Sequence, residues 1–267
     1  MSQYASQITG NILVNLRSID GKLYNCTDNN LYKVEKINHN TTTLSNSNTK
    51  FSPSSIRLVG GVAGTNSDNL LVLYFKKKNE IATKFTLSFW WYQKDSIFSN
   101  SSWIYCGIDI QSTYYKNNYS NLYIMPHLGQ NVGFWTQYGG YNNSSTFQSI
   151  FSTYSTHSQE PLNTWVHYAV CRNDNTIYFF KNGVLLSSKS KQINDMFGFN
   201  MFRIIRYNNT AEFYVDDAVY IENQALWTSN FTPPNDYLTG QYTGTLGKKK
   251  SVIPNYVPFY QDKAFIY

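Results

Sequence analysis

The sequence predicts a nearly all-β protein that folds as a single sandwich of antiparallel sheets. Aromatic residues make up 17% of its 267 residues and charged residues only 14%, a balance that suits pleated, half-buried strands. Short apolar or alternating runs recur between clusters of Asn, Ser, Gly and Asp, and no run keeps the 3.6-residue period of a helix. A chain of this length can form one β domain.

Thirteen short runs are predicted to be strands, because each is apolar or alternating and is bounded by turn residues. They cover residues 12–16, 31–37, 54–59, 70–75, 85–92, 103–110, 122–125, 132–138, 165–171, 177–180, 184–188, 202–205 and 213–221. The strongest local signal is Asn182-Gly183, which lies between two of these runs. Both residues tolerate a positive φ, so the pair predicts a tight type I′ hairpin.

The chain is predicted to divide into a sandwich domain at 1–236 and an extended C-terminal arm at 237–267. In the arm the strand pattern weakens, and glycines, a lysine triplet and two prolines stand among aromatic residues. So many exposed aromatic side chains would make a free arm insoluble. We therefore expect the arm to pack on its own sandwich or on a neighbouring subunit.

Charge and leader patterns exclude several classes of protein. Much of the formal charge of +6 comes from lysine triplets at 76–78 and 248–250, without an arginine-rich stripe, so nucleic acid is not an expected partner. The N-terminus lacks the pattern of a secretory signal, and no apolar run approaches the ~18 residues of a membrane span. We expect synthesis in the cytoplasm without a signal peptide, and no membrane insertion. Cys26, Cys106 and Cys171 are expected to be free thiols, because their number is odd and no CxxC spacing occurs.

Five segments contain motifs that are typical of strands and hairpins. They are FSPSSIRLVG at 51–60, FTLSFWW at 85–91, LNTWVHYAV at 162–170, YFFKNG at 178–183 and DAVYIENQAL at 217–226. In this order they resemble the laminin-G-like jelly-roll domains of the concanavalin A-like lectin and glucanase superfamily. The resemblance implies two packed antiparallel sheets with jelly-roll connectivity.

The same resemblance implies a binding role. Such domains mostly bind glycans or proteins, and many are modules of phage or other virion proteins and of cell-surface adhesins. No cofactor is predicted; calcium is the ion that the family suggests. This sequence has Ala218 where the family has an acidic residue, and only Asp216 and Asp217 can be nominated as ligands, whereas calcium needs several oxygens. Hydrogen bonding of this pair within the fold is the favoured interpretation.

Alternation along the strands predicts a binding face. In the run at 85–92, one stripe is apolar and suits the core, whereas the other combines aromatic rings with Ser and Thr. Aromatic rings cover the apolar face of a sugar, and neighbouring polar groups bind its hydroxyls. The candidate ligand-binding residues are Trp90, Tyr92, Trp103, Tyr105 and Tyr123, with Trp135 and Tyr138, whose stripe depends on register, and Tyr141 in an adjoining loop. The alternative is that these rings lie under loops or at a subunit contact.

No catalytic residues are predicted, and the chain is not expected to be an enzyme. Glycoside hydrolases of the superfamily carry two carboxylates spaced two apart on one strand, and no glutamate here belongs to such a pair. Asp216 and Asp217 are adjacent, so on a regular strand they would face opposite ways. His167 falls in a strand motif, where a structural histidine is expected.

The leading hypothesis is a non-catalytic module that binds a glycan or surface receptor on a virion or cell surface. Its arm would then contact other virion subunits. The second hypothesis is a decoration or cement protein of a virion, whose aromatic face is an interface between subunits. A glycoside hydrolase is the third and least favoured.

Overall fold

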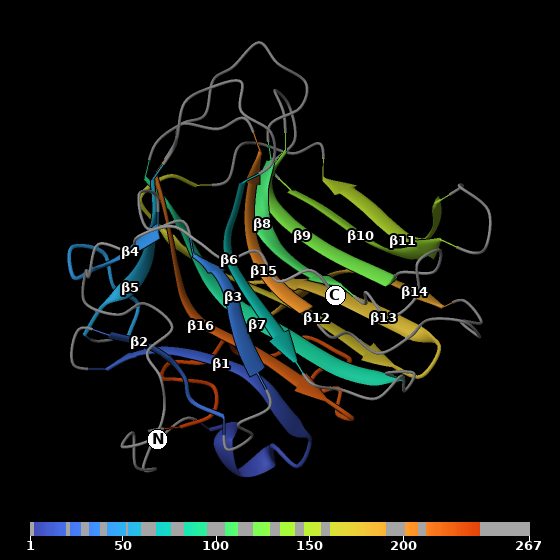
Figure 1. Ribbon diagram of the computed structural model, residues 1–267. Helices are drawn as coiled ribbons and strands as arrows, with labels where there is room; N and C mark the ends of the chain where they lie inside the picture. Colours follow the sequence, from blue (N-terminus) through green and yellow to red (C-terminus); the bar gives the residue numbers. More distant parts are fainter. Residues whose placement is uncertain are drawn as a thin grey trace.

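Two antiparallel sheets pack face to face in the computed structural model of the chain (Figure 1). The structure describes residues 3–19, 22–27, 32–37, 42–51, 53–59, 68–75, 83–94, 105–111, 120–128, 134–141, 147–155, 161–190, 201–207 and 212–240. Within these ranges the one helical element is a short 3-10 turn, Ala5–Gln7. No described helix is long and apolar enough to cross a membrane.

The first sheet has nine strands. They are β1 (Asn11–Ile19), β2 (Lys22–Asn25), β4 (Thr42–Ser45), β5 (Ser55–Leu58), β7 (Lys84–Gln93), β12 (Trp165–Asn173), β13 (Thr176–Lys181), β14 (Val184–Ser190) and β16 (Phe213–Glu222). Their order is β14-β13-β12-β7-β16-β1-β2, and β5 also pairs with β16 and carries β4. β7 therefore lies near the middle of the sheet, with β12 on one side and β16 on the other.

The second sheet has seven strands. They are β3 (Tyr32–Ile37), β6 (Asp68–Phe75), β8 (Tyr105–Gln111), β9 (Ser120–Leu128), β10 (Phe134–Tyr141), β11 (Phe147–Ser155) and β15 (Met201–Tyr207). Their order is β11-β10-β9-β8-β15-β6-β3. Sequence neighbours are thus often separated within a sheet, as in a jelly roll, and the prediction of a two-sheet antiparallel sandwich is confirmed.

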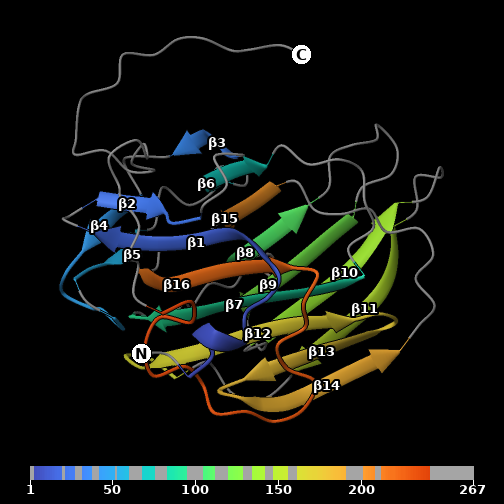
Figure 2. The same ribbon diagram turned by 90° about the horizontal axis from the view of Figure 1, so that it is seen from below.

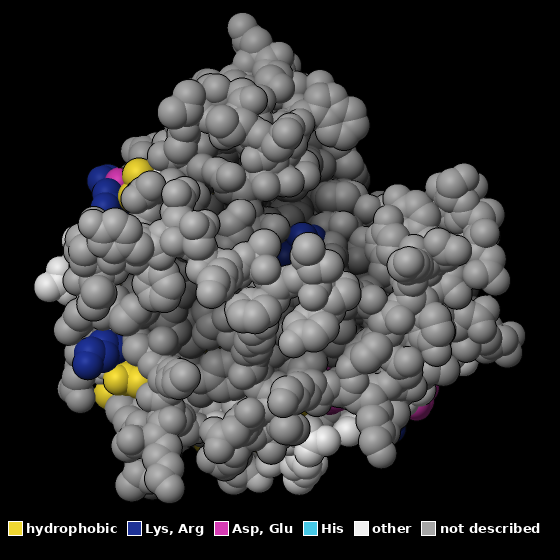
Figure 3. All heavy atoms as spheres, in the orientation of Figure 1, with side chains coloured by type: hydrophobic (Ala, Val, Ile, Leu, Met, Phe, Trp, Pro, Cys, Tyr) yellow, Lys and Arg dark blue, Asp and Glu magenta, His cyan; other side chains and the backbone are white. Residues whose placement is uncertain are grey.

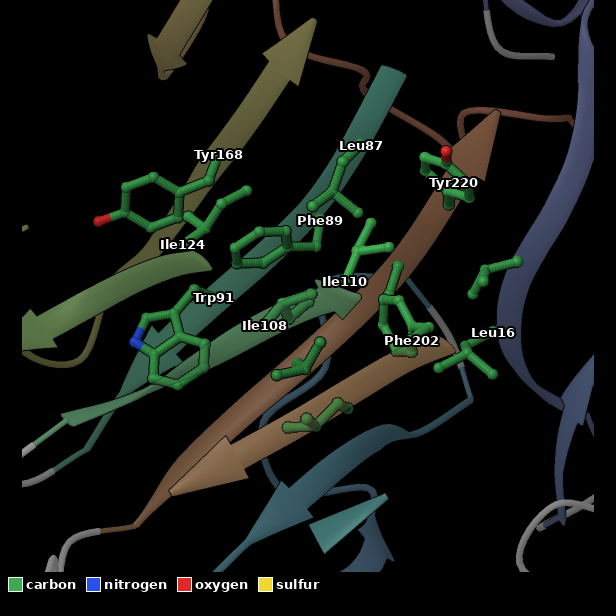
Figure 4. Close-up of a cluster of buried hydrophobic side chains, with 14 of the residues drawn as sticks. Leu16, Leu87, Phe89, Trp91, Ile108, Ile110, Ile124, Tyr168, Phe202 and Tyr220 are labelled. Atoms are coloured by element: carbon green, nitrogen blue, oxygen red, sulfur yellow. The ribbon is translucent and has the colours of Figure 1, made fainter. Parts of the chain in front are cut away.

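The core between the sheets contains the apolar stripe that alternation predicted. Leu87, Phe89 and Trp91 point from β7 toward Ile108 and Ile110 of β8 (Figure 4). All five side chains are buried. Because neighbouring strand residues face opposite ways, the residues between them on β7 lie on the outer face of the nine-stranded sheet.

Each of the thirteen predicted runs overlaps an observed strand, but three strands were not predicted. These are β2, β4 and β11, and each pairs with a single strand among the described residues. An edge strand buries less of its surface, so its sequence needs fewer apolar residues. The alternation used to predict strands is correspondingly weaker there.

The predicted hairpin is confirmed between β13 and β14. Asn182 and Gly183 have φ values of 49° and 76°, as a type I′ turn requires. The Asn182 side chain fixes the turn, because its Oδ1 accepts a hydrogen bond from the His167 N–H at 2.9 Å. On the other side, the Gly183 carbonyl accepts a 2.9 Å hydrogen bond from the N–H of Phe231.

Gly183→Ala is expected to destabilise the protein by more than about 1 kcal/mol, because alanine is strained at positive φ. A Cβ at this position would also lie 1.9 Å from the Phe231 carbonyl oxygen, so residue 231 would have to move. Urea denaturation measures the effect. Gly240→Ala is the control, since Gly240 has a similar φ of 74° but its added Cβ would only approach the Ala5 Cβ at 3.1 Å. An equal loss in both variants would contradict the role of the Phe231 contact.

Residues 223–240 leave β16 and cover the outer face of the nine-stranded sheet. Trp227, Phe231 and Leu238 pack with Tyr4 and Phe180 in a second apolar cluster, separate from the main core. Figure 2 shows this orange-red segment close to the short helical turn near the N-terminus. The predicted boundary at 236/237 stays a prediction. Residues 237–240 pack on the sandwich, and residues 241–267 lie outside the described residues.

Candidate functional site

The outer face of the nine-stranded sheet is organised in rows that run across β12, β7 and β16. Backbone register places Trp90 between His167 and Asp216, and places Tyr92 between Trp165 and Tyr214. The side chains of a row share one face of the sheet, because they occupy directly opposite positions on neighbouring strands. The row of Trp90 and the row of Tyr92 differ in how they are covered.

The row of Trp90 is buried. Trp90 is 6% exposed, packs against the rings of Phe51 and His167 at centroid distances of 6.1 and 5.0 Å, and has the Lys50 Nζ 3.8 Å from its centroid. The prediction that Trp90 offers an open ring to a ligand is therefore wrong. Its stripe does face away from the main core, but residues 48–51 and 223–240 fold over this stripe. We call these two segments the cover.

The predicted platform is also divided between the two sheets. Trp90 and Tyr92 belong to the nine-stranded sheet, whereas five other candidates lie on β8, β9 and β10 of the seven-stranded sheet: Tyr105, Tyr123, Trp135, Tyr138 and Tyr141. A single face made of all of them is thus contradicted. Trp103 lies outside the described residues. Ligand binding by the residues on β8, β9 and β10 stays a prediction.

Asp216 and Asp217 form a buried acidic pair on this outer face. The register of β16 shifts between Asp216 and Val219, and Asp217 adopts a φ of 45°, which marks a β-bulge. Val215 and Ala218 on either side contact the main core, whereas both carboxylates bind groups of the outer cover. The expectation that the two aspartates face opposite ways is therefore wrong, because the bulge interrupts the alternation.

Backbone N–H groups hold both carboxylates of the pair. Asp216 accepts hydrogen bonds from the N–H groups of Lys50, Phe51 and Asp217 at 3.2, 3.0 and 2.8 Å. Asp217 accepts one from the N–H of Leu238 at 2.8 Å, and its buried Oδ1 has no partner among the described residues. Burial raises the pKa of Asp216 to about 6 and that of Asp217 to about 8.

These contacts make the pair a structural tie between β16 and its cover. In the described part of the chain, no group of three or more His, Cys, Asp or Glu side chains is placed to hold a metal ion. Three of the four carboxyl oxygens of the pair accept backbone N–H donors instead. Opposite them, the buried Arg17 lies 4.2 Å from the centroid of the Tyr237 ring and donates to the Thr239 hydroxyl, so residues 237–239 are held from both sides.

His167 is a buried structural histidine. Its Nε2 lies 2.8 Å from the Ser88 hydroxyl, and the ring is surrounded by Trp90, Trp227 and Phe231. Burial, with a smaller contribution from the Lys50 charge, lowers the pKa of His167 to about 3. The ring is therefore neutral at pH 7 and is enclosed by the cover, which does not suit a general base.

The row of Tyr92 is less deeply buried than the row of Trp90. Among the described residues, the cover leaves two of its rings partly exposed. Tyr92 and Trp165 are half-buried, with ring centroids 5.4 Å apart, and the buried Tyr214 ring stands edge-on to Tyr92 at 5.6 Å. Arg57 of β5 is the register partner of Tyr214 and extends the row. We call Trp165, Tyr92, Tyr214 and Arg57 the open row.

Charged and polar groups border the open row. Glu212 contacts the Arg57 Nε at 2.7 Å through one carboxylate oxygen and the Lys94 Nζ at 3.0 Å through the other. These hydrogen bonds, Arg57 first, lower the pKa of Glu212 to about 2, so its carboxylate is ionised at pH 7. Tyr92 donates its hydroxyl proton to Asn163 at 3.2 Å. Figure 3 shows cationic, acidic and hydrophobic side chains meeting at the upper left, where β5 and β16 come together in Figure 1.

The sequence prediction included only Tyr92 of the open row. Trp165 and Tyr214 were assigned to strands but not to the face. A signal existed, because Trp165 has the same parity as His167, and Tyr214 alternates with the core residues Phe213 and Val215. The missing information was the register that brings β12, β7 and β16 together.

Comparisons with known proteins support the fold. No protein-family model and no curated protein matches the sequence. The botulinum neurotoxin serotype D binding domain matches with a TM-score of 0.55 at 13% identity, over 86% of this chain and 50% of that chain. The botulinum neurotoxin type G receptor binding domain gives 0.54 at 11% identity, over 87% and 51%. The binding domain of botulinum neurotoxin DC, in complex with SialylT, gives 0.51 at 14%, over 81% and 48%.

This chain spans about half the length of those binding domains. At such identities the likeness concerns the fold alone, a jelly-roll sandwich. The finer resemblance to laminin-G-like domains has no matching family model behind it. The chemistry of binding therefore has to be argued from the residues of the open row.

Proposed function

We propose that this protein is a non-catalytic binding module that takes a glycan on the open row. The observation that carries the proposal is the pair of half-buried rings, Tyr92 and Trp165, at the end of the sheet face that the described residues leave partly open. Aromatic rings with one accessible side cover the C–H face of a sugar.

Polar groups beside these rings suit the hydroxyls of a sugar. The exposed Asn163 side chain already accepts the Tyr92 hydroxyl proton, and its amide N–H donors can serve a ligand. Near the other end of the row, the exposed Ser47 hydroxyl lies 3.4 Å from that of Tyr214. Rings flanked by a few hydrogen-bonding groups are typical of ligand sites.

A binding role without catalysis also fits the acidic residues of this face. Glu212 is held by Arg57 and Lys94, and its low pKa keeps it from donating a proton near pH 7. Asp216 and Asp217 are buried and accept backbone N–H groups. Neither arrangement offers the accessible acid and base that hydrolysis of a glycosidic bond needs.

We further propose that the module acts on a virion or a cell surface, with its C-terminal arm directed to a neighbouring subunit. The alternative remains a decoration or cement protein. Val184 and Leu186 favour that alternative, because they are exposed apolar residues on β14, which lies at the edge of the sheet. Mass photometry separates the two: self-association without any glycan supports the cement protein, whereas a monomer that binds glycan supports the module.

Tyr92→Ala and Trp165→Ala are each expected to weaken glycan binding about tenfold or more, because each removes one of the two accessible rings. A glycan array selects the ligand, and titration calorimetry then compares the variants. Tyr178→Ala is the matched control, since this half-buried ring lies on β13, outside the open row, and stacks near Phe180. Equal binding by all three variants and the unsubstituted protein would remove the open row as the site.

A further inference from the structure

The two half-buried rings of the open row belong to neighbouring strands. Trp165 of β12 and Tyr92 of β7 are register partners, and their ring centroids lie 5.4 Å apart. The planes of the two rings are inclined to each other by 51°. The twist that rotates neighbouring strands of a sheet contributes to such an inclination. The open row therefore presents two ring surfaces side by side that face in different directions.

Contacts on the protein side hold the Tyr92 ring in place. The buried Tyr214 ring stands edge-on to it at 5.6 Å, and the Tyr92 hydroxyl donates to Asn163 at 3.2 Å. Asn163 is itself fixed, because its N–H donates to the Gln93 carbonyl at 2.8 Å. A surface that is already ordered loses little conformational entropy when it binds a ligand. The angle between the Tyr92 and Trp165 rings is thus a property of the fold.

A single sugar does not fit both rings at once. Each apolar contact between carbon atoms spans about 3.5–4 Å, so a sugar stacked between two rings needs about 7–8 Å between them. The centroids of Tyr92 and Trp165 are only 5.4 Å apart. A pyranose laid over the outside of the pair lies flat on only one ring, because the ring planes are inclined by 51°. Each ring therefore needs a sugar of its own.

Resting on the proposed function, we infer that the ligand is a stretch of a single glycan chain in which two consecutive sugars lie on Tyr92 and Trp165, one on each ring. The separation of the ring centroids is close to the length of one pyranose unit along a chain, so neighbouring sugars reach both rings. Rotation about the glycosidic bond turns the two sugar faces to match the inclined rings. A flat crystalline polysaccharide, whose sugars lie in one plane, meets only one ring at a time.

The glycosidic bond makes the second contact favourable. Once the first sugar lies on one ring, the second sugar is already beside the other ring. Its contact then adds affinity without a second loss of translational freedom. Affinity is therefore expected to rise steeply from one sugar to two or three.

The test compares soluble probes of increasing length. Glucose, xylose, mannose, galactose and N-acetylglucosamine are each offered to the full chain as the free sugar and as linear oligomers of two to four units, and titration calorimetry gives the dissociation constants. In a series that binds, we expect the dimer or trimer to bind about tenfold or more tightly than the monosaccharide. Crystalline cellulose and chitin are expected to retain the unsubstituted protein no better than they retain Tyr92→Ala.

Tyr92→Ala and Trp165→Ala are each expected to abolish the gain with length, because each variant keeps one of the two rings and binds the oligomer about as weakly as the monosaccharide. Tyr92→Phe keeps the ring and loses only the hydroxyl that donates to Asn163, so it should retain most of the gain. Tyr178→Ala is again the matched control, since this ring lies on β13 outside the open row. An equal loss of the gain in Tyr178→Ala would contradict the assignment to the open row.

The outcomes separate this inference from the proposed function. Binding of monosaccharides that depends on Tyr92 and Trp165 but does not improve with length would retain the glycan module and overturn the chain ligand. Retention on crystalline cellulose or chitin that Tyr92→Ala abolishes would do the same. Absence of binding to every probe would overturn both. A gain with length that both ring deletions lose and Tyr178→Ala retains supports the inference.

Discussion

Replacement of Trp90 by alanine is expected to lower the free energy of unfolding by about 3–5 kcal/mol, the usual loss when a buried tryptophan is truncated. The ring fills the space between Phe51, His167 and the Lys50 side chain. Backbone hydrogen bonds from Lys50 and Phe51 to Asp216 and from His167 to Asn182 hold these neighbours, so we expect the site to collapse only in part. Urea denaturation followed by circular dichroism measures the loss.

Trp165→Ala is the appropriate comparison, because Trp165 lies on the same face but is half-buried. Trp165→Ala is expected to lose clearly less stability than Trp90→Ala. The folded fraction of Trp165→Ala is nevertheless expected to bind the ligand more weakly than the folded fraction of Trp90→Ala. Trp90→Phe keeps most of the ring contacts and should recover much of the stability. A Trp90→Ala variant within about 1 kcal/mol of the unsubstituted protein would contradict the burial of this ring.

Asp217→Asn is expected to change how stability depends on pH. The folded-state pKa of Asp217, about 8, lies above its ordinary value of 3.8. A carboxyl with a raised pKa contributes stability that is present at low pH and is lost as pH rises through the folded-state value. From pH 6 to pH 8.5, the ionisation of Asp217 should therefore cost the unsubstituted protein about 2–3 kcal/mol.

The variant lacks this cost, because an asparagine amide does not ionise and can still accept the Leu238 N–H. Its stability relative to the unsubstituted protein should rise by the same amount between pH 6 and pH 8.5. His167, whose pKa is lowered to about 3, acts in the opposite direction below pH 6.5 but is present in both proteins, so it cancels in the difference. Equilibrium urea unfolding at five pH values checks this, and a difference independent of pH would contradict it.

The central strands could be predicted from the sequence because each has to bury one or both of its faces. Leu87, Phe89 and Trp91 alternate with less apolar residues, and the structure places all three in the core between the sheets. The hairpin at Asn182-Gly183 could also be predicted, because two adjacent residues determine the type of turn. Edge strands such as β4 were not predicted, because their polar sequences resemble those of loops.

The candidate site was predicted only in part, because it depends on contacts between distant segments. Alternation assigned Trp90 and Tyr92 to the same stripe, which the structure supports. Nothing in the local sequence indicates that Lys50 and Phe51 pack on Trp90 while Tyr92 stays half-buried. The same holds for the return of residues 223–240 over His167. The left-handed conformation of Asp217 was likewise not predicted, since aspartate adopts it only where the surrounding structure requires it.

The cover over the nine-stranded sheet has a consequence for how the chain folds. Tyr4 donates its hydroxyl proton to the carbonyl of Thr232, 228 residues away, and Thr86 donates to that of Gln224, 138 residues away. Contacts between such distant positions form slowly, because a long loop must close before they stabilise anything. We expect a late intermediate in which the strands have paired while Trp90 and His167 are still exposed to water. That intermediate, with its bare apolar surface, is the species from which aggregation should start, and a chain cut before residue 223 should remain trapped in it.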